Sequence, residues 1–231
     1  MSKFHIIYFV CMTKLWKEKT ILSFNNILKS KILEDDKLYK LYIISTGEND
    51  DFEELKKIWK HHKIEFTLFS NDLKVHEYPG IEKVKKISLD NPKDNILYFH
   101  SKGITRGNAA SDWVEYMEYF NIIKYKNCLE YLNKDIDIVG VEYLDRPKPH
   151  MSGNFWWAKC NYINKLTLPK PQSKRHDFEW FICSSKSFKA FSFHQSKIDT
   201  PRFPGFNASS RSTYLPQFYK NKNFKGYIYK K

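Results

Sequence analysis

The sequence of 231 residues lacks several signatures that mark well-known protein classes. No glycine follows the first apolar segment between Cys11 and Lys14, which argues against a Rossmann dehydrogenase and against a P-loop enzyme. The four cysteines are far apart, so no zinc knuckle or redox pair is visible. The apolar run at the N-terminus is too short to span a bilayer and is followed by no signal-peptide cleavage site. We therefore expect reduced thiols and a cytoplasmic protein without a transmembrane segment.

The composition is basic and rich in aromatic residues. The formal net charge is +13, and the chain contains 15 Tyr, 18 Phe and 6 Trp. This balance favours anionic partners such as nucleic acid, an anionic membrane or a phosphorylated small molecule. The lysines form no block of five or six, a spread that a Lys-rich genome would also produce. A non-catalytic basic protein that binds nucleic acid or anionic glycan therefore stays open as an alternative, although no nucleic-acid-binding motif appears.

Apolar and amphipathic segments alternate through the first half of the chain. Strands are expected at 4–12, 38–45, 64–69 and 95–100, and helices at 16–28, 50–59 and 78–89. This order predicts a parallel sheet wrapped by helices. In the second half we expect strands at 136–144 and 188–193 and helices at 111–132, 161–166 and 177–184. The chain would form one domain over residues 1–194, with 195–231 as a C-terminal wrap or mobile lid of the same domain.

The segment NILYFHSKG, residues 95–103, is central to the functional interpretation. Its apolar part predicts a buried strand, and in open α/β sheets ligands bind beyond the carboxyl ends of the strands. His100, Ser101 and Lys102 would lie at that edge, and Gly103 would let the backbone turn there. Lys102 offers a charge for phosphate, and His100 a metal or hydrogen-bond ligand. The alternative is an ordinary polar turn after a strand.

A second polar cluster, Ser152, Gly153 and Asn154, precedes the paired Trp156 and Trp157. A turn of small residues beside tryptophans is a common way to build a platform for a sugar. Because side chains alternate along an extended chain, we expect one of the two indole rings to face a ligand. Core packing is the alternative for each ring.

A third polar cluster contains Arg175, His176, Asp177 and Glu179. Either acid could be a general base within reach of an acceptor hydroxyl, or it could complement the dipole at a helix start. Two residues apart on a helix, the acids point about 200° away from each other, so one should face the cleft. We favour Asp177 for that position and keep Glu179 as the alternative.

The order of these segments resembles a family of glycosyltransferases found in bacteria and large DNA viruses. The resemblance rests on YFHSKG, a long helix with Trp113 and Met117, the strand DIVGVEY, and then HMSGNFWWAKCNYINKL and DFEWF. It covers residues 4–194, is strongest over 98–181, and GNFWWA is its most specific part. These proteins look like GT-A enzymes, so the resemblance implies a GT-A-like α/β domain with a mixed, mostly parallel sheet flanked by helices.

The resemblance also implies an activity, the transfer of a sugar from a nucleotide-sugar donor to a saccharide or glycoprotein acceptor. The cytoplasm would be that of the host if the source is viral. Thr13 and Lys14 would hold the nucleotide, and Lys102 and Arg175 would balance the diphosphate charge. The late acidic position of the GT-A pattern matches Asp177 or Glu179, and Ser152 to Asn154 with the tryptophans would meet the acceptor or sugar. A GT-A-like protein that binds a sugar nucleotide without turnover is a further alternative.

Metal dependence is the point at which this sequence departs from the GT-A pattern. GT-A enzymes carry a DXD motif after the fourth strand, and its acids bind a divalent metal such as Mn²⁺ or Mg²⁺. Here that position reads His100-Ser101-Lys102 and contains no acid, so Lys102 would neutralise phosphate directly. The literal DXD at Asp135–Asp137 leads into a strand and is interpreted as coincidence. If a metal is bound, the candidate ligands are His100 and His194.

Overall fold

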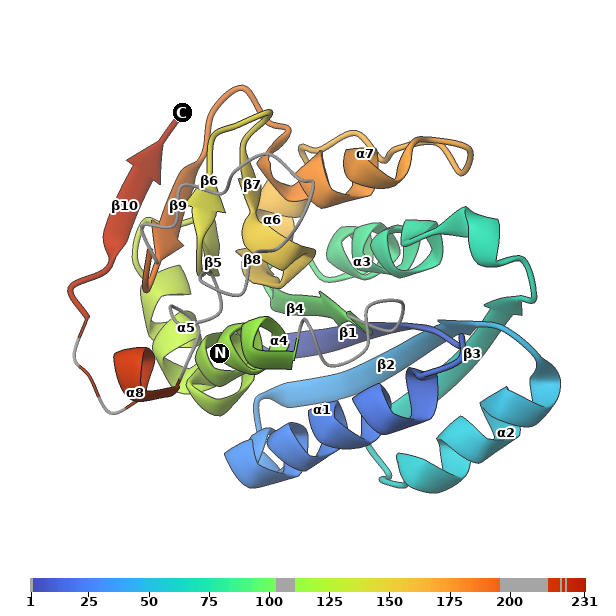
Figure 1. The fold of residues 1–231 in the computed structure, drawn as a ribbon. Coiled ribbons are helices and arrows are strands. Elements are labelled where there is room, and N and C mark those ends of the chain that lie inside the picture. Colours follow the sequence, from blue (N-terminus) through green and yellow to red (C-terminus); the bar gives the residue numbers. More distant parts are fainter. Residues whose placement is uncertain (1, 103–110, 196–215, 221, 223) are drawn as a thin grey trace.

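The first half of the chain folds as its alternating pattern predicts. The structure is a computed structural model that describes residues 2–102, 111–195, 216–220, 222 and 224–231. Its first elements are β1 (Phe4–Cys11), α1 (Trp16–Ser30), β2 (Leu38–Thr46), α2 (Asn49–Ile58), β3 (Ile64–Ser70), α3 (Tyr78–Asp90) and β4 (Asn95–His100). β1 pairs in parallel with both β2 and β4, and β2 pairs in parallel with β3. As Figure 1 shows, α1 and α2 lie on one side of these strands and α3 on the other.

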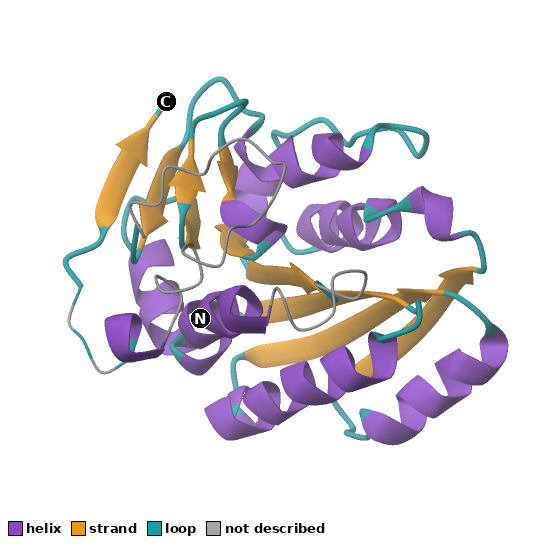
Figure 2. Cartoon of the chain, viewed as in Figure 1, coloured by secondary structure: helices purple, strands orange, loops and turns teal. Residues whose placement is uncertain are grey.

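The second half adds shorter elements to the same sheet. They are α4 (Ser111–Glu118), α5 (Tyr125–Leu132), β5 (Ile138–Gly140), β6 (Tyr143–Leu144), β7 (His150–Met151), β8 (Trp156–Lys159), α6 (Cys160–Ile163), α7 (Arg175–Trp180), β9 (Lys189–Ser192), α8 (Pro216–Tyr219) and β10 (Tyr227–Lys230). The main sheet has 8 strands in the order β10-β9-β5-β8-β4-β1-β2-β3, and β6 pairs with β7 separately. β8 runs antiparallel to β4 and β5, and β10 antiparallel to β9. Figure 2 shows helices on both faces of this sheet. The predicted α/β class, with a mixed, mostly parallel sheet flanked by helices, is confirmed.

The helix predicted at 111–132 is interrupted. A π-helical turn, Tyr119–Ile123, separates α4 from α5, and the Lys124 amide donates to the Tyr119 carbonyl oxygen at 2.9 Å. This wider turn is packed in place, because the indole Nε1 of Trp157 donates to the Asn121 carbonyl oxygen at 2.8 Å. A sequence pattern of apolar spacing carries no mark of such a turn.

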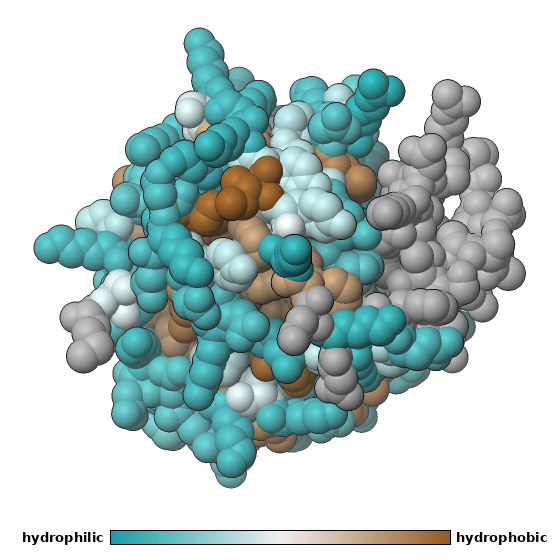
Figure 3. Space-filling model, turned by 90° about the vertical axis from the view of Figure 1, so that its left-hand side faces the viewer, coloured by the Kyte–Doolittle hydropathy of each residue, from teal (hydrophilic) through white to brown (hydrophobic). Residues whose placement is uncertain are grey.

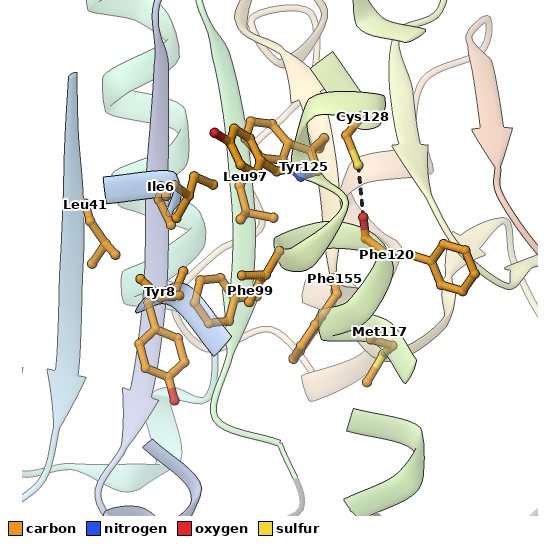
Figure 4. Close-up of a cluster of buried hydrophobic side chains, with 14 of the residues drawn as sticks. Ile6, Tyr8, Leu41, Leu97, Phe99, Met117, Phe120, Tyr125, Cys128 and Phe155 are labelled. Carbon is orange, nitrogen blue, oxygen red and sulfur yellow. Dashed lines mark hydrogen bonds between the residues drawn. The ribbon is translucent and has the colours of Figure 1, made fainter. Parts of the chain in front are cut away.

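The sheet buries a separate hydrophobic cluster on each face. Side chains alternate along a strand, so Ile6 and Tyr8 of β1 face α1, α2, α4 and α5, whereas Ile7 and Phe9 face α3, α6 and α7. Figure 4 shows part of the first cluster, where the thiol of Cys128 donates to the Phe120 carbonyl oxygen at 3.3 Å. Two covered faces explain why the central strands read as continuous apolar runs.

The described end of the chain joins the sheet. β10 pairs with β9 at the edge, and the ring of Tyr219 in α8 packs against Tyr116 with centroids 5.2 Å apart. Figure 3 views the side of the molecule where β10 lies, and its surface is mostly hydrophilic with a small hydrophobic patch. Gly103 and the span 196–215 lie outside the described residues, and so does most of the predicted lid. Within the described part, no helix is both long enough and apolar enough to cross a membrane.

Candidate functional site at the carboxyl end of β4

The carboxyl ends of β1 and β4 are fastened together by Ser101. Its amide donates to the Phe9 carbonyl oxygen at 2.8 Å, and its hydroxyl oxygen accepts from the Cys11 amide at 3.0 Å. Ser101 is buried, with 6% of its surface exposed. Its hydroxyl group therefore holds the two strand ends in register at the predicted edge.

A buried carboxyl group, that of Glu77, lies beside this edge. Glu77 stands at the N-cap of α3, but its side chain caps no amide and turns toward the sheet. The first turn of α3 approaches the sheet closely at Gly80, where an added Cβ would lie 2.8 Å from Phe9 Cβ and 2.9 Å from Tyr98 Cε2. Glycine at this position thus lets α3 bring the Glu77 carboxyl group to the Tyr98 hydroxyl.

Glu77 is the centre of a hydrogen-bonded network that joins four parts of the chain. Its Oε2 accepts from the Tyr98 hydroxyl at 3.0 Å and from Asn154 Nδ2 at 2.6 Å. The Asn154 Oδ1 in turn accepts from Trp156 Nε1 at 2.7 Å. The other carboxyl oxygen of Glu77, Oε1, lies 3.6 Å from His100 Nδ1. Since these groups come from α3, β4, β8 and the turn before β8, the network fixes where those elements meet.

The network favours neutral side chains. Burial lowers the pKa of His100 to about 3, with Lys102 adding to the effect. Its Nε2 lies 3.0 Å from the Gly153 carbonyl oxygen, which can only accept, so Nε2 carries the proton and Nδ1 is an acceptor. Burial also raises the pKa of Glu77 to about 7, against the effect of Lys102. Below about pH 7 Glu77 is mostly protonated, so in that range the pair consists of two neutral groups and is not an ion pair.

Charged groups lie next to this neutral network. Lys102 Nζ lies 4.5 Å from the ring centroid of Trp113. Glu179, on α7, has 17% of its side chain exposed, and its carboxylate oxygens lie 3.6 Å from Arg175 Nε and 3.4 Å from His176 Nδ1. Burial raises the pKa of Glu179, but Lys102, Arg175 and the two histidines outweigh it and hold the pKa below its usual value. Glu179 is therefore an anion beside Lys102 and Arg175.

Asp177, the acid favoured as the base from the sequence, is bonded to the backbone at the start of its own helix. Its Oδ2 accepts from the Lys174 amide at 3.1 Å and so caps the start of α7. It also lines a separate pocket of about 290 Å³ with Lys148, Trp180 and others. Lys102 and His100 both act electrostatically on Glu179.

Trp156 and Trp157 do not form a sugar platform in this structure, contrary to the sequence prediction. Both are 0% exposed, Trp156 in the cluster under α3 and α6 and Trp157 in the cluster under α4 and α5. They do alternate as expected for a strand, but β8 is an inner strand with both faces covered. Each indole N–H is bonded inside the protein, to Asn154 and to the Asn121 carbonyl oxygen respectively.

The predicted acceptor turn, residues 152–154, is also buried. Gly153 has a φ of +74°, and an added Cβ would lie 2.2 Å from Met117 Sδ and 3.2 Å from the Trp113 ring. The Ser152 amide donates to the Glu142 carbonyl oxygen at 2.9 Å. These small residues allow close packing and shape the site, and the Gly153 carbonyl group orients His100.

The other predicted donor-binding residues lie at or near the same edge. Thr13 and Lys14 lie just beyond the end of β1, after Met12. Lys14 is exposed, whereas Thr13 Oγ1 is buried and has no hydrogen-bond partner. Arg175 is exposed at the start of α7 and interacts with Glu179. The structure thus brings Lys102, Arg175 and Glu179 together, with Thr13 and Lys14 one strand away.

The described residues do not fit the metal site considered from the sequence. They contain no group of three or more His, Cys, Asp or Glu that could hold a metal ion. Tyr98, Trp156, Gly140 and Ser192 are register partners across the neighbouring strands β4, β8, β5 and β9. His100 lies two residues after Tyr98, and His194 lies two residues after Ser192. The two histidines are therefore three strands apart, roughly 14 Å at the usual strand spacing. His194 Nδ1 instead lies 2.8 Å from the Tyr116 hydroxyl oxygen. No step is assigned to a metal.

Glu77 was missed because its sequence context is ordinary. An acid directly before a helix usually complements the helix dipole, and Glu77 precedes Tyr78-Pro79-Gly80 in that way. Its partners Tyr98 and Asn154 lie 21 and 77 residues away. No local pattern signals that an acid at a helix start turns inward, so only the assembled fold identifies it.

Comparison with solved structures finds distant likeness. A cytidylyltransferase from Leptospira borgpetersenii serovar Hardjo-bovis (strain JB197) matches with 12% identity and a TM-score of 0.45, over 80% of this chain and 72% of that chain. A 4-diphosphocytidyl-2C-methyl-D-erythritol synthase matches with 10% identity and a TM-score of 0.38, over 71% of this chain and 78% of that chain. The synthase of that name from Anaerococcus prevotii DSM 20548 matches with 10% identity and a TM-score of 0.38, over 76% of this chain and 81% of that chain. Likeness at this level assigns no activity.

Comparison by sequence gives a family. No curated protein matches the chain significantly. One family model, described as "Domain of unknown function (DUF8361)", matches residues 18–211. That range begins in α1 and contains Glu77, His100, Lys102, Asn154 and Glu179. The chain therefore belongs to the DUF8361 family.

Proposed function

We propose that this protein is a transferase that uses a nucleotide sugar and moves the sugar to a saccharide or glycoprotein acceptor. The observation that carries the proposal is the meeting of Lys102, Arg175 and Glu179 at the carboxyl edge of a mostly parallel sheet. That edge is where open α/β sheets bind ligands. The resemblance of the HSKG and GNFWWA segments to glycosyltransferases supports the same class.

In this proposal the two cations act on the leaving group. As the bond between sugar and diphosphate breaks, negative charge grows on the diphosphate, and Lys102 and Arg175 stabilise it. Lys102 is held in place by the end of β4 through Ser101 and His100. A charge fixed before the reaction needs little rearrangement in the transition state, which is what makes such stabilisation effective.

Glu179 is the candidate base. Its lowered pKa keeps it ionised at neutral pH, where it can accept the proton of an acceptor hydroxyl as the new bond to the sugar forms. Asp177 is less suited, because its carboxylate accepts from the Lys174 amide. The acceptor itself is proposed only as a saccharide or glycoprotein hydroxyl.

A thermal-shift screen tests the proposal. UDP-, GDP- and dTDP-linked sugars are added singly to the full chain, with and without Mn²⁺. A donor at 100 times its Kd should stabilise the folded protein by about 2.7 kcal/mol and raise the melting temperature. A sugar nucleotide that binds but is never transferred would indicate a non-catalytic binder. If none binds while duplex nucleic acid does, the proposed function is wrong and the basic binding protein is favoured.

A further inference from the structure

Among the described residues, the carboxyl groups of Glu77 and Glu118 are buried and have their pKa raised to about 7, mainly by burial. Glu118 accepts from Ser23 Oγ and Asn26 Nδ2, between α1 and α4. Glu77 differs in its surroundings, since Lys102 and Glu179 both act on it. Of these two acids, only Glu77 is therefore coupled electrostatically to the candidate site.

The contacts of Glu77 extend to each structural part of the site. Its Oε2 holds Asn154, the residue after Gly153, and Gly153 orients the His100 ring. His100 ends β4 and is two residues from Lys102. The groups that face Glu77 are Tyr98 and His100 from β4, Asn154 from the turn before β8, Lys102 beyond β4 and Glu179 from α7.

We propose that Glu77 is a positioning residue of this site, which holds His100 and Asn154 in place as a neutral acid and so keeps the end of β4 positive toward an anionic ligand. The inference rests on the proposed function for the identity of that ligand, a diphosphate group. When Glu77 loses its proton to solvent, the site gains a negative charge beside Lys102. The new charge repels the diphosphate and weakens its binding.

Inorganic pyrophosphate is the probe for this effect. Its affinity for the full chain is measured by calorimetry at pH 6 and pH 8 for the parent, Glu77→Gln and Glu118→Gln. Glutamine keeps the shape of the neutral acid but does not ionise. A like charge roughly 10 Å away at an effective dielectric constant of about 20 should weaken binding about tenfold. The parent and Glu118→Gln should therefore lose about tenfold more affinity over this range than Glu77→Gln.

The comparison between variants removes the titration of pyrophosphate itself, which is common to all three proteins. Glu118→Gln controls for the loss of a buried carboxyl group of similar pKa. If Glu77→Gln and the parent lose affinity equally between pH 6 and pH 8, the proposal is overturned. If no protein binds pyrophosphate at either pH, the anion site and the proposed function fail, and the next measurement decides the role of Glu77.

Nuclear magnetic resonance of the His100 ring tests Glu77 without a ligand. In the parent, His100 should stay neutral with its proton on Nε2 from pH 5 to pH 8. The Nδ1 resonance should shift with a midpoint near pH 7, where the pKa of Glu77 lies. That shift should vanish in Glu77→Gln. A His100 ring that takes up a second proton near its ordinary pKa would refute the neutral pair.

Discussion

Replacing Gly153 by alanine should destabilise the protein through two separate effects. The φ of +74° costs a residue with a Cβ about 1–2 kcal/mol. The new Cβ would also lie 2.2 Å from Met117 Sδ, and overpacking of this kind costs about 1–3 kcal/mol. The free energy of unfolding should therefore fall by roughly 2–5 kcal/mol in sum.

A double-mutant cycle separates these effects. Met117→Ala alone should cost about 2–5 kcal/mol, because it opens a cavity in the core. Combined with Gly153→Ala it removes the clash, so the double variant should be about 1–3 kcal/mol more stable than the sum of the single variants predicts. Urea unfolding gives all four values. Additive single effects would refute the packing role of Gly153 and favour the prediction that its turn meets the acceptor or sugar.

Two further predictions concern the acids. Glu179→Gln should lower the rate of sugar transfer by about 10²–10⁴-fold, whereas Asp177→Asn should stay close to the parent; initial rates decide, and the reverse order would restore the base favoured by the sequence. For Glu118, the raised pKa means that the protonated carboxyl group contributes its full share to the free energy of unfolding below pH 4.5. This contribution is lost as the pH rises to about 7 and above. Glu118→Gln should remove about 3 kcal/mol of this pH dependence in urea unfolding from pH 4.5 to 8, and parallel curves would contradict the burial argument.

The sequence predicts the first half of the fold well, because long two-sided apolar strands alternate with amphipathic helices. The predicted bounds of β2, 38–45, differ by one residue from Leu38–Thr46. The second half is less predictable, since its strands are short. The predicted strand at 136–144 divides into β5 and β6 around Glu142, whose φ is +52°. Three- and two-residue strands carry too little periodicity to locate.

The sequence predicts where the candidate site lies in the fold, but not which of its side chains are buried. Lys102 follows an evident buried strand, so the rule for sheet edges places it correctly. The prediction that Trp156 or Trp157 faces a ligand is wrong because an exposed and a buried aromatic pair look alike in sequence. Their burial depends on β8 being an inner strand. Glu77 was missed because its hydrogen bonds join segments far apart in the chain.

The central claim is that the cation at the end of β4 binds the donor of a sugar-transfer reaction. Calorimetric titration of a nucleotide sugar into the parent, Lys102→Ala and Lys57→Ala tests it most directly. Lys57 is an exposed lysine of α2 and serves as the matched control. A hydrogen bond to a charged group contributes about 1.5–3 kcal/mol, so Lys102→Ala should weaken donor binding by about tenfold or more. The affinity of Lys57→Ala should equal that of the parent. Equal affinities of all three proteins would contradict the account.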